Sequence, residues 1–200
     1  MRVLVACEFS GIVRDAFAAK GHDAWSCDLL PTERLGQHIQ GDALEHLDDG
    51  WDLMIAHPDC RFLTLAGLHW NNRIHGRKER TAEALEFVRQ LLNAPIPRIA
   101  LENPIGCIST HIRKPNQIIQ PHQFGHPESK QTALWLVGLP KLVPTNILTP
   151  TRFQKNGRPR WDNQTPTGQN KLGPSPDRWK KRSRTYQGIA TAMADQWGSL

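Results

Sequence analysis

The 200-residue sequence has few cysteines, a single tyrosine and no long apolar stretch. No apolar run approaches the roughly 20 residues of a membrane-spanning helix, and no basic-then-apolar signal sequence is present. The four cysteines, at positions 7, 27, 60 and 107, lie far apart, without the spacing of a zinc site or a disulfide framework. We therefore expect a cytoplasmic protein with reduced thiols, no membrane contact and no bound metal.

The charge is unevenly distributed along a chain whose overall composition, 38% hydrophobic and 22% charged, is that of a globular domain. Residues 151–185 contain ten Lys or Arg and two Asp, a balance of +8. The rest of the chain contains fifteen basic and seventeen acidic residues, a balance of −2. Such a strip is either a solvated surface or a polyanion site. Trp161 and Trp179 lie among the charges and favour a nucleic acid, on whose bases they could stack.

The first part of the chain has the pattern of a nucleotide-cofactor site. The apolar runs 2–7 and 24–27 are typical of buried strands, and residues 12–20 between them are typical of a helix. A strand–turn–helix unit places backbone N–H groups and the positive end of the helix beside a bound cofactor. Gly11 lies in the turn, and Asp28 follows the second strand where an acid accepts from a ribose hydroxyl. A lone glycine and a lone acid are each weak signals, so the prediction rests on their order.

Two further apolar runs end in polar motifs. Residues 53–56 precede His57-Pro58-Asp59-Cys60, and residues 98–101 precede Glu102-Asn103-Pro104. Pro58 cannot donate to a strand ladder, so we expect the strand to end there, with Cys60 at the carboxyl edge of the sheet. The carboxyl ends of parallel strands meet at one edge. The two motifs therefore predict a thiol and a carboxyl group in one pocket.

The remaining segments complete an α/β pattern. Residues 68–80 are rich in Arg and His and include Trp70, so we interpret them as a lid or substrate clamp. We predict an amphipathic helix over 81–93 capped by Thr81, a strand over 133–137 and a helix over 187–197. Between 140 and 176 prolines and glycines are frequent and periodicity is lost. The alternation predicts an α/β fold with a mainly parallel, doubly wound sheet and a small irregular appendage.

In their order along the chain, these motifs resemble those of cytosine-5 DNA methyltransferases. The residues that carry the resemblance are Phe9-Ser10-Gly11, Asp28, Asp42, Pro58-Asp59-Cys60, Glu102-Asn103-Pro104 and Gln187-Gly188-Ile189-Ala190. The segments HPESKQTALWLVGLPKLVPT and SRTYQGIATAMADQWG look like a compact phage and prophage group of that family. The resemblance covers most of the chain and implies a Rossmann-like fold that uses S-adenosylmethionine.

The resemblance also implies roles for individual residues. For the cofactor, it places Phe9, Ser10 and Gly11 at the methionine and adenosine, Asp28 at the ribose and Asp42 at the adenine amino group, with Pro58 in the same pocket. Cys60 matches the nucleophile, and Glu102 matches the acid that holds the cytosine. Lys130 and Thr132 fall near the two arginines of a Gln-x-Arg-x-Arg segment.

The family's pattern divides the chain into a catalytic domain, residues 1–140 with 184–200, and a short basic substrate-recognition segment, residues 141–183. DNA is then expected to bind through 68–80 and 151–185. The sequence departs from the family at Asp59, where proline is usual, at Val13, where a glycine is usual, and at the two arginine positions. A carboxylate beside Cys60 would raise the pKa of the thiol unless it points away.

The implied chemistry needs these residue types. A thiolate that adds to carbon 6 of cytosine leaves enamine-like density at carbon 5, which can attack a sulfonium methyl group. A protonated Glu102, its pKa raised by burial, would donate to ring nitrogen 3. The alternatives are the same chemistry on a free pyrimidine nucleotide, or a catalytically inactive nucleic-acid-binding relic of the fold. A zinc site of His57, Cys60 and His69 lacks paired spacing, and the zinc deaminase motif is missing.

Overall fold

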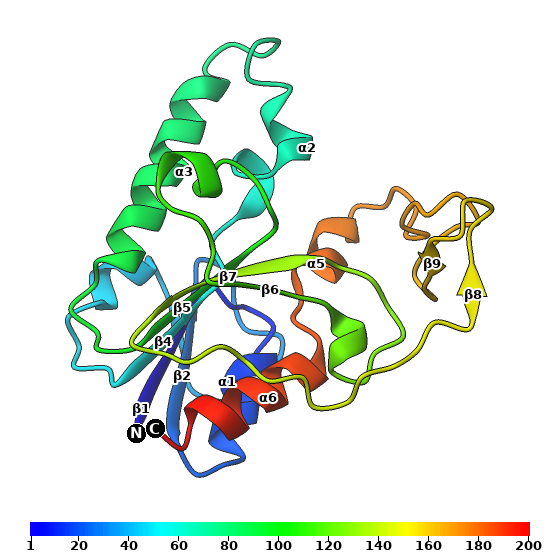
Figure 1. Cartoon of the computed structure of the whole chain (residues 1–200). Coiled ribbons are helices and arrows are strands. Elements are labelled where there is room, and N and C mark those ends of the chain that lie inside the picture. The colour runs from blue at the N-terminus through cyan, green and yellow to red at the C-terminus, as the bar shows by residue number, and fades with distance from the viewer.

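The computed structural model describes residues 1–200 and contains a seven-stranded sheet with helices on both faces (Figure 1). The strands are β1 Arg2–Ala6, β2 Asp23–Asp28, β3 His38–Gln40, β4 Leu53–Ala56, β5 Ile99–Asn103, β6 Gln117–Ile119 and β7 Thr132–Val137. Their order across the sheet is β3-β2-β1-β4-β5-β7-β6.

Strands β1 to β5 are parallel, and β7 runs antiparallel to both of its neighbours, β5 and β6. From β1 the chain passes to β2 on one side and later returns to β4 on the other side, so the strand order reverses between β1 and β4. Open α/β sheets bind ligands at the carboxyl ends of the strands beside such a reversal. The predicted α/β fold with a mainly parallel sheet is confirmed.

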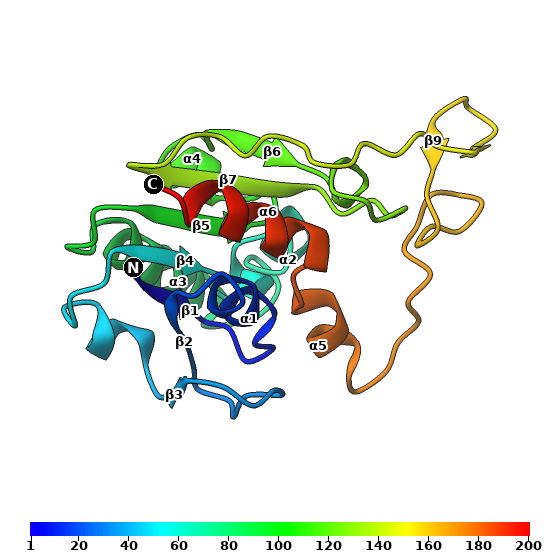
Figure 2. The same cartoon turned by 90° about the horizontal axis from the view of Figure 1, so that it is seen from below.

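The helices are α1 Ile12–Ala18, α2 Leu65–Leu68, α3 Arg77–Leu92, α4 Ile108–His111, α5 Arg178–Ser183 and α6 Gln187–Trp197. Three short 3-10 helices, η1 Ala43–His46, η2 Cys60–Phe62 and η3 Pro121–Gln123, follow strand ends. Helices α1 and α6 cover one face of the sheet, and α3 and α4 cover the other (Figure 2). None of the helices combines the length and apolar character that crossing a membrane requires.

Each face of the sheet has its own hydrophobic cluster, because successive residues of a strand point to opposite sides. Val3 and Val5 of β1 belong to the cluster under α1 and α6. Leu4, between them, belongs to the cluster under α3 and α4. Because helices cover both faces, the central strands are continuous apolar runs, as the sequence predicts.

The polar segment 68–80 includes the end of α2 and the first turn of α3. Helix α3 begins at Arg77, with Gly76 as its N-cap, and not at Thr81. The Thr81 hydroxyl donates to the carbonyl oxygen of Arg77 and is hydrogen-bonded to the amide of Asn71. The predicted capping role of Thr81 is therefore wrong, since this residue instead holds the turn before α3 against the helix. The three-residue strands β3 and β6 were not predicted.

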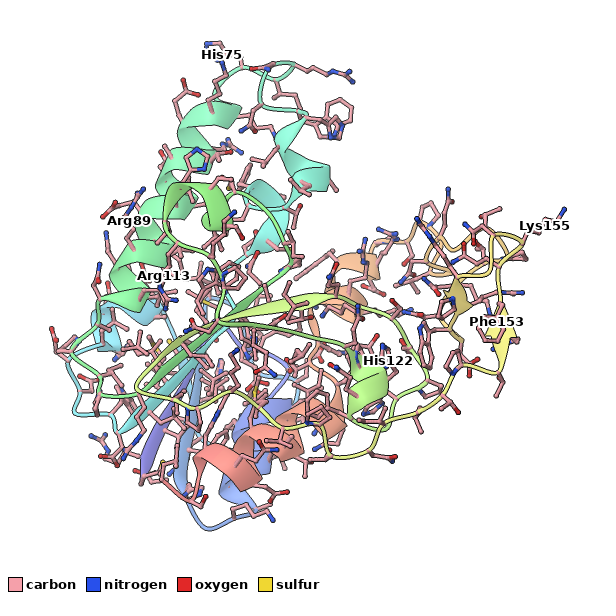
Figure 3. The ribbon with its side chains drawn as sticks, viewed as in Figure 1. His75, Arg89, Arg113, His122, Phe153 and Lys155 are labelled. Atoms are coloured by element: carbon pink, nitrogen blue, oxygen red, sulfur yellow. The ribbon has the colours of Figure 1, made fainter.

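Residues 151–183 form a lobe that adds no strand to the large sheet, whereas residues 141–148 run along the body, where Leu142 is buried in the cluster under α1 and α6. The lobe contains the two-stranded ribbon of β8 Arg152–Phe153 and β9 Pro159–Arg160, followed by α5. It packs on the body through Trp161, which is 8% exposed and stacks on His122 with ring centres 4.2 Å apart. Figure 3 shows His122 on the body, and Phe153 and Lys155 at the outer end of the lobe. The expected stacking of Trp161 on bases is therefore wrong.

Candidate active site

A cleft of about 2070 Å³ opens at the carboxyl edge of the sheet. The ends of β2, β4 and β5 form its floor, with residues that follow β1. The α2–α3 region forms one wall, and the lobe with α5 forms another. Seven of the nine predicted site residues line this cleft: Phe9, Asp28, Asp42, Pro58, Cys60, Glu102 and Lys130.

Cys60 begins η2, in the turn directly after β4. Asp59 caps this turn, because its Oδ1 accepts from the backbone N–H of Arg61 at 2.8 Å. Asn103, at the end of β5, donates from Nδ2 to the carbonyl oxygen of Pro58 at 2.8 Å. The two strand-end motifs are thus hydrogen-bonded to each other, which holds the thiol beside the end of β5.

The loops after β4 and β5 meet a second time at Gly106. The backbone N–H of Cys107 donates to the carbonyl oxygen of Leu63 at 2.8 Å. A Cβ at position 106 would collide with the same oxygen, so only glycine allows this approach. The position of Cys60 relative to Glu102 therefore depends on backbone contacts as well as on Asn103.

Glu102 is buried at the end of β5, and its Oε2 lies 2.8 Å from Nδ1 of His57. Burial alone would raise the pKa of this carboxyl group. The hydrogen bond with His57 and the positive charge of Lys130 outweigh burial and hold the pKa below its usual value. The expected raised pKa of Glu102 is therefore wrong. The prediction from the sequence included His57 only as a candidate zinc ligand and did not pair it with Glu102.

The pKa of the Cys60 thiol is raised. Desolvation within the cleft and the carboxylates of Asp59 and Glu102 favour the neutral thiol, and the cations of Lys130 and Arg182 offset this only in part. The Asp59 carboxylate pairs with the Arg61 guanidinium at 3.3 Å. The resting site thus holds a thiol and a carboxylate side by side.

Asp28, at the end of β2, and Asp42, shortly after β3, line the cleft. Oδ1 of Asp28 accepts from the backbone N–H of Leu30 at 2.9 Å, and Oδ1 of Asp42 accepts from that of Leu44 at 3.0 Å. Each aspartate therefore uses one oxygen to hold its own turn. Burial raises the pKa of Asp28, and hydrogen bonds from the backbone N–H groups of Leu30 and Leu29 offset this in part. Both carboxylates line the cleft, where they can accept from hydroxyl or amino donors of a ligand.

Ser10 and Gly11 lie outside the cleft lining. Gly11, with φ of 69°, is the N-cap of α1, and Ser10 Oγ donates to Glu8 Oε1 at 3.1 Å. The buried Glu8 carboxylate also accepts from the backbone N–H groups of Val13 and Arg14, at 2.8 and 3.1 Å. A side chain of the protein thus satisfies the start of α1, and the roles of Ser10 and Gly11 in cofactor binding stay predictions.

Lys130 precedes β7, and its Nζ lies 5.9 Å from the ring centre of Tyr186. Tyr186, which the sequence did not single out, also lines the cleft and donates to Glu128 Oε2 at 2.6 Å. Thr132 is buried, and its hydroxyl donates to the carbonyl oxygen of Lys130. The segment that resembles the arginine motif therefore supplies one cation to the cleft. No group of three or more His, Cys, Asp or Glu side chains is placed to hold a metal ion.

No protein-family model matches the sequence, and no curated protein matches it. Among solved structures, the chain is similar to a prophage-encoded E. coli protein described as a candidate DNA modification methyltransferase. The TM-score is 0.46 and the sequence identity 13%, over 77% of this chain and 56% of that one. The chain thus spans little more than half the length of that protein. A likeness at this level does not assign an activity.

Proposed function

We propose that the protein transfers a methyl group from S-adenosylmethionine to carbon 5 of cytosine in DNA, with Cys60 as the nucleophile. The observation that carries this proposal is the placement of Cys60 after β4 and of Glu102 at the end of the neighbouring parallel strand β5, in one cleft. The hydrogen bond from Asn103 to Pro58 joins their two loops. A thiol beside a carboxyl group suits covalent addition to a ring that must then accept a proton.

The residues at the ends of β1 and β2 suit S-adenosylmethionine. Asp28 and Asp42 present carboxylates to the cleft, and Phe9 and Leu30 add apolar side chains to its lining. These residues stand beside the reversal of strand order, where open α/β sheets bind their ligands. When bound there, S-adenosylmethionine supplies an electrophilic methyl group on a positively charged sulfur.

In the proposed reaction, the first step within the protein is the transfer of a proton between Cys60 and Glu102. The resting pair is a Cys60 thiol and a Glu102 carboxylate, whereas the reaction needs a thiolate and a carboxylic acid. These two states hold the same number of protons, so a shift of one proton from sulfur to carboxyl prepares the site. The Cys60 sulfur then bonds to carbon 6, Glu102 gives its proton to nitrogen 3, and the electron pair at carbon 5 takes the methyl group.

The second half of the reaction restores the aromatic ring. Carbon 5 loses its proton to a water molecule of the solvent, and the electron pair of that bond expels the Cys60 thiolate from carbon 6. Glu102 recovers the proton from nitrogen 3, which returns the carboxyl group to the form that began the reaction. A thiolate suits both steps, because it is a strong nucleophile and also a good leaving group.

The distribution of cations favours DNA as the substrate over a free nucleotide. Arg61 and Arg80 line the cleft from the α2–α3 side, and Lys171, Lys181 and Arg182 line it from the lobe side. A single phosphate needs only one or two cations, whereas cations on both walls fit a chain of phosphates. A cytosine in a duplex must leave the base stack to enter the cleft, at a cost of a few kcal/mol.

Transfer of a labelled methyl group to DNA and, separately, to dCMP tests the proposal. Cys60→Ser should abolish transfer to DNA and leave the cofactor affinity within about twofold. Cys107→Ala, at a buried thiol outside the cleft, is the matched control and should remain active. Turnover by Cys60→Ser would overturn the choice of nucleophile, and transfer to dCMP alone would overturn DNA as the substrate. No transfer to either by the wild-type protein would overturn the enzymatic function.

A further inference from the structure

His57 contacts both strands that lie beside β4 at the candidate active site, β1 and β5. It follows β4 directly, and its backbone N–H donates to the carbonyl oxygen of Ala6 at 2.9 Å, which keeps it aligned with β1. Its side chain is 9% exposed, and Nδ1 lies 2.8 Å from Oε2 of Glu102. His57 is thus held by a hydrogen bond of its backbone N–H and by a contact of one ring nitrogen.

The surroundings of the other ring nitrogen define the tautomer of His57. Nε2 is buried and has no hydrogen-bond partner. A buried N–H without an acceptor is rare in proteins, and an imidazolium would need acceptors at both nitrogens. A bare lone pair at Nε2 avoids both difficulties. The neutral form with its hydrogen on Nδ1 therefore fits, since Nδ1 then donates to the Glu102 carboxylate.

We propose that His57 is a positioning residue that occupies Oε2 of Glu102 and so reserves Oε1 for the proton delivered to the substrate ring. The identity of that ring rests on the proposed function. A protonated carboxyl group has one oxygen that donates and one that accepts. Because Oε2 accepts from Nδ1–H, a proton added to Glu102 goes to Oε1. The same hydrogen bond restricts rotation of the carboxyl group and so keeps its plane fixed during the reaction.

Three other groups face Glu102. They are Lys130 before β7, Thr132 at the start of β7, and Cys60 in the turn after β4. Lys130 lowers the pKa of Glu102 through its charge, and Thr132 lowers it by hydrogen bonding. The Thr132 hydroxyl also donates to the carbonyl oxygen of Lys130 at 3.2 Å. His57 is the side chain whose ring nitrogen lies 2.8 Å from Oε2, and this contact assigns the acceptor role to that oxygen.

Two substitutions of His57 distinguish the effect of its hydrogen bond to Glu102 from the effect of the space that its ring fills. His57→Leu fills a similar space without a donor, and His57→Asn keeps an N–H near the position of Nδ1. In His57→Leu we expect kcat for methyl transfer to fall about 10- to 100-fold, because proton delivery contributes 10²–10⁴ to such reactions. The cofactor affinity should not change, and His57→Asn should recover most of the rate. Equal losses in both variants, or no loss in His57→Leu, would overturn the inference.

Two NMR measurements test the same arrangement independently of turnover. In wild-type protein with ¹⁵N-labelled histidine, His57 should carry its hydrogen on Nδ1, and a hydrogen on Nε2 would overturn the inference without any variant. With ¹³C-labelled glutamate, the pKa of Glu102 should rise in His57→Leu and remain low in His57→Asn, because only the former loses the donor to the carboxylate. An unchanged Glu102 titration in His57→Leu would overturn this inference. Absence of methyl transfer in the wild-type protein would instead overturn the proposed function.

Discussion

The indole ring of Trp179 lies 5.9 Å from the phenyl ring of Phe9, centre to centre, with an angle of 57° between the ring planes. Phe9 follows β1 and lines the cleft beside the proposed cofactor site, and Trp179 belongs to the basic helix α5. Arg184, directly after α5, donates to both carboxylate oxygens of Glu33, at 3.0 and 2.9 Å. The basic segment is thus fastened to the loop after β2, and the proposed cofactor and DNA sites share a wall.

Trp179→Ala should weaken S-adenosylmethionine binding about two- to tenfold, because an aromatic pair contributes about 0.5–1.5 kcal/mol beyond its buried area. Trp179→Phe should keep most of the affinity. Calorimetry measures both, with Trp70→Ala as a control at a tryptophan outside the cleft lining. Equal affinities of Trp179→Ala and the wild-type protein would show that α5 is not part of the cofactor wall.

Asp28→Asn should weaken cofactor binding about tenfold to a hundredfold, since a hydrogen bond to a charged group contributes about 1.5–3 kcal/mol. Asparagine keeps an oxygen that accepts from the N–H of Leu30, so the turn after β2 should survive. Asp23→Asn changes an exposed carboxylate at the start of the same strand and is the control. If calorimetry finds both variants equal to the wild-type protein, the ribose does not bind at Asp28.

The alkylation rate of Cys60 by iodoacetamide should increase with pH through a midpoint above the ordinary pKa of cysteine, because the cleft and two carboxylates disfavour the thiolate. Asp59→Asn removes one of these charges and keeps an acceptor for the N–H of Arg61. The midpoint should then move to lower pH. Mass spectrometry of the Cys60 peptide follows the reaction, and Asp52→Asn, outside the cleft, is the control. A midpoint unchanged by Asp59→Asn would mean that Arg61 screens the carboxylate.

Substitution of Lys155 and Arg158 by glutamine should weaken DNA binding and reduce the salt dependence of the affinity. Each lost phosphate contact should lower the slope of log K against log salt by about 0.9. These residues lie on the lobe outside the cleft lining, so the cofactor affinity should not change. The control is the double substitution of Lys20 and Lys114 by glutamine, since these exposed residues follow α1 and α4 and lie outside both the lobe and the cleft lining. An unchanged slope in the lobe variant would remove the lobe from the DNA interface.

The sequence predicted the strands that are covered on both faces, since a continuous apolar run bounded by proline or acidic residues has few other interpretations. This applies to β1, β4, β5 and β7. The strands β3 and β6 have three residues each, and five of these six positions are exposed or only partly buried, so they carry no such pattern. Helix α3 extends beyond its prediction because its first turn consists of charged residues that give no apolar signal.

The residues that share the cleft were also predictable, because the carboxyl ends of parallel strands meet at one edge of a sheet. Which side chains pair there was not. The His57–Glu102 pair, the capping of α1 by Glu8 and the stacking of Trp161 on His122 depend on side-chain direction and on contacts between segments. The pKa of Glu102 is lowered, opposite to the expected direction, because of one such contact. Spacing along the chain contains no information on these geometries.

The two hydrophobic clusters of the sheet also differ in the order in which they can form. The cluster under α3 and α4 uses residues between Leu4 and Trp135, whereas the other joins Val3 and Phe17 with Met193 and Trp197 of α6. Contacts across so long a stretch of chain pay a larger entropy of loop closure and form late in folding. Partial unfolding should therefore release α6 first, and with it the adjoining α5 wall of the cleft. Hydrogen exchange should show weaker protection in α1 and α6 than in α3 and β5.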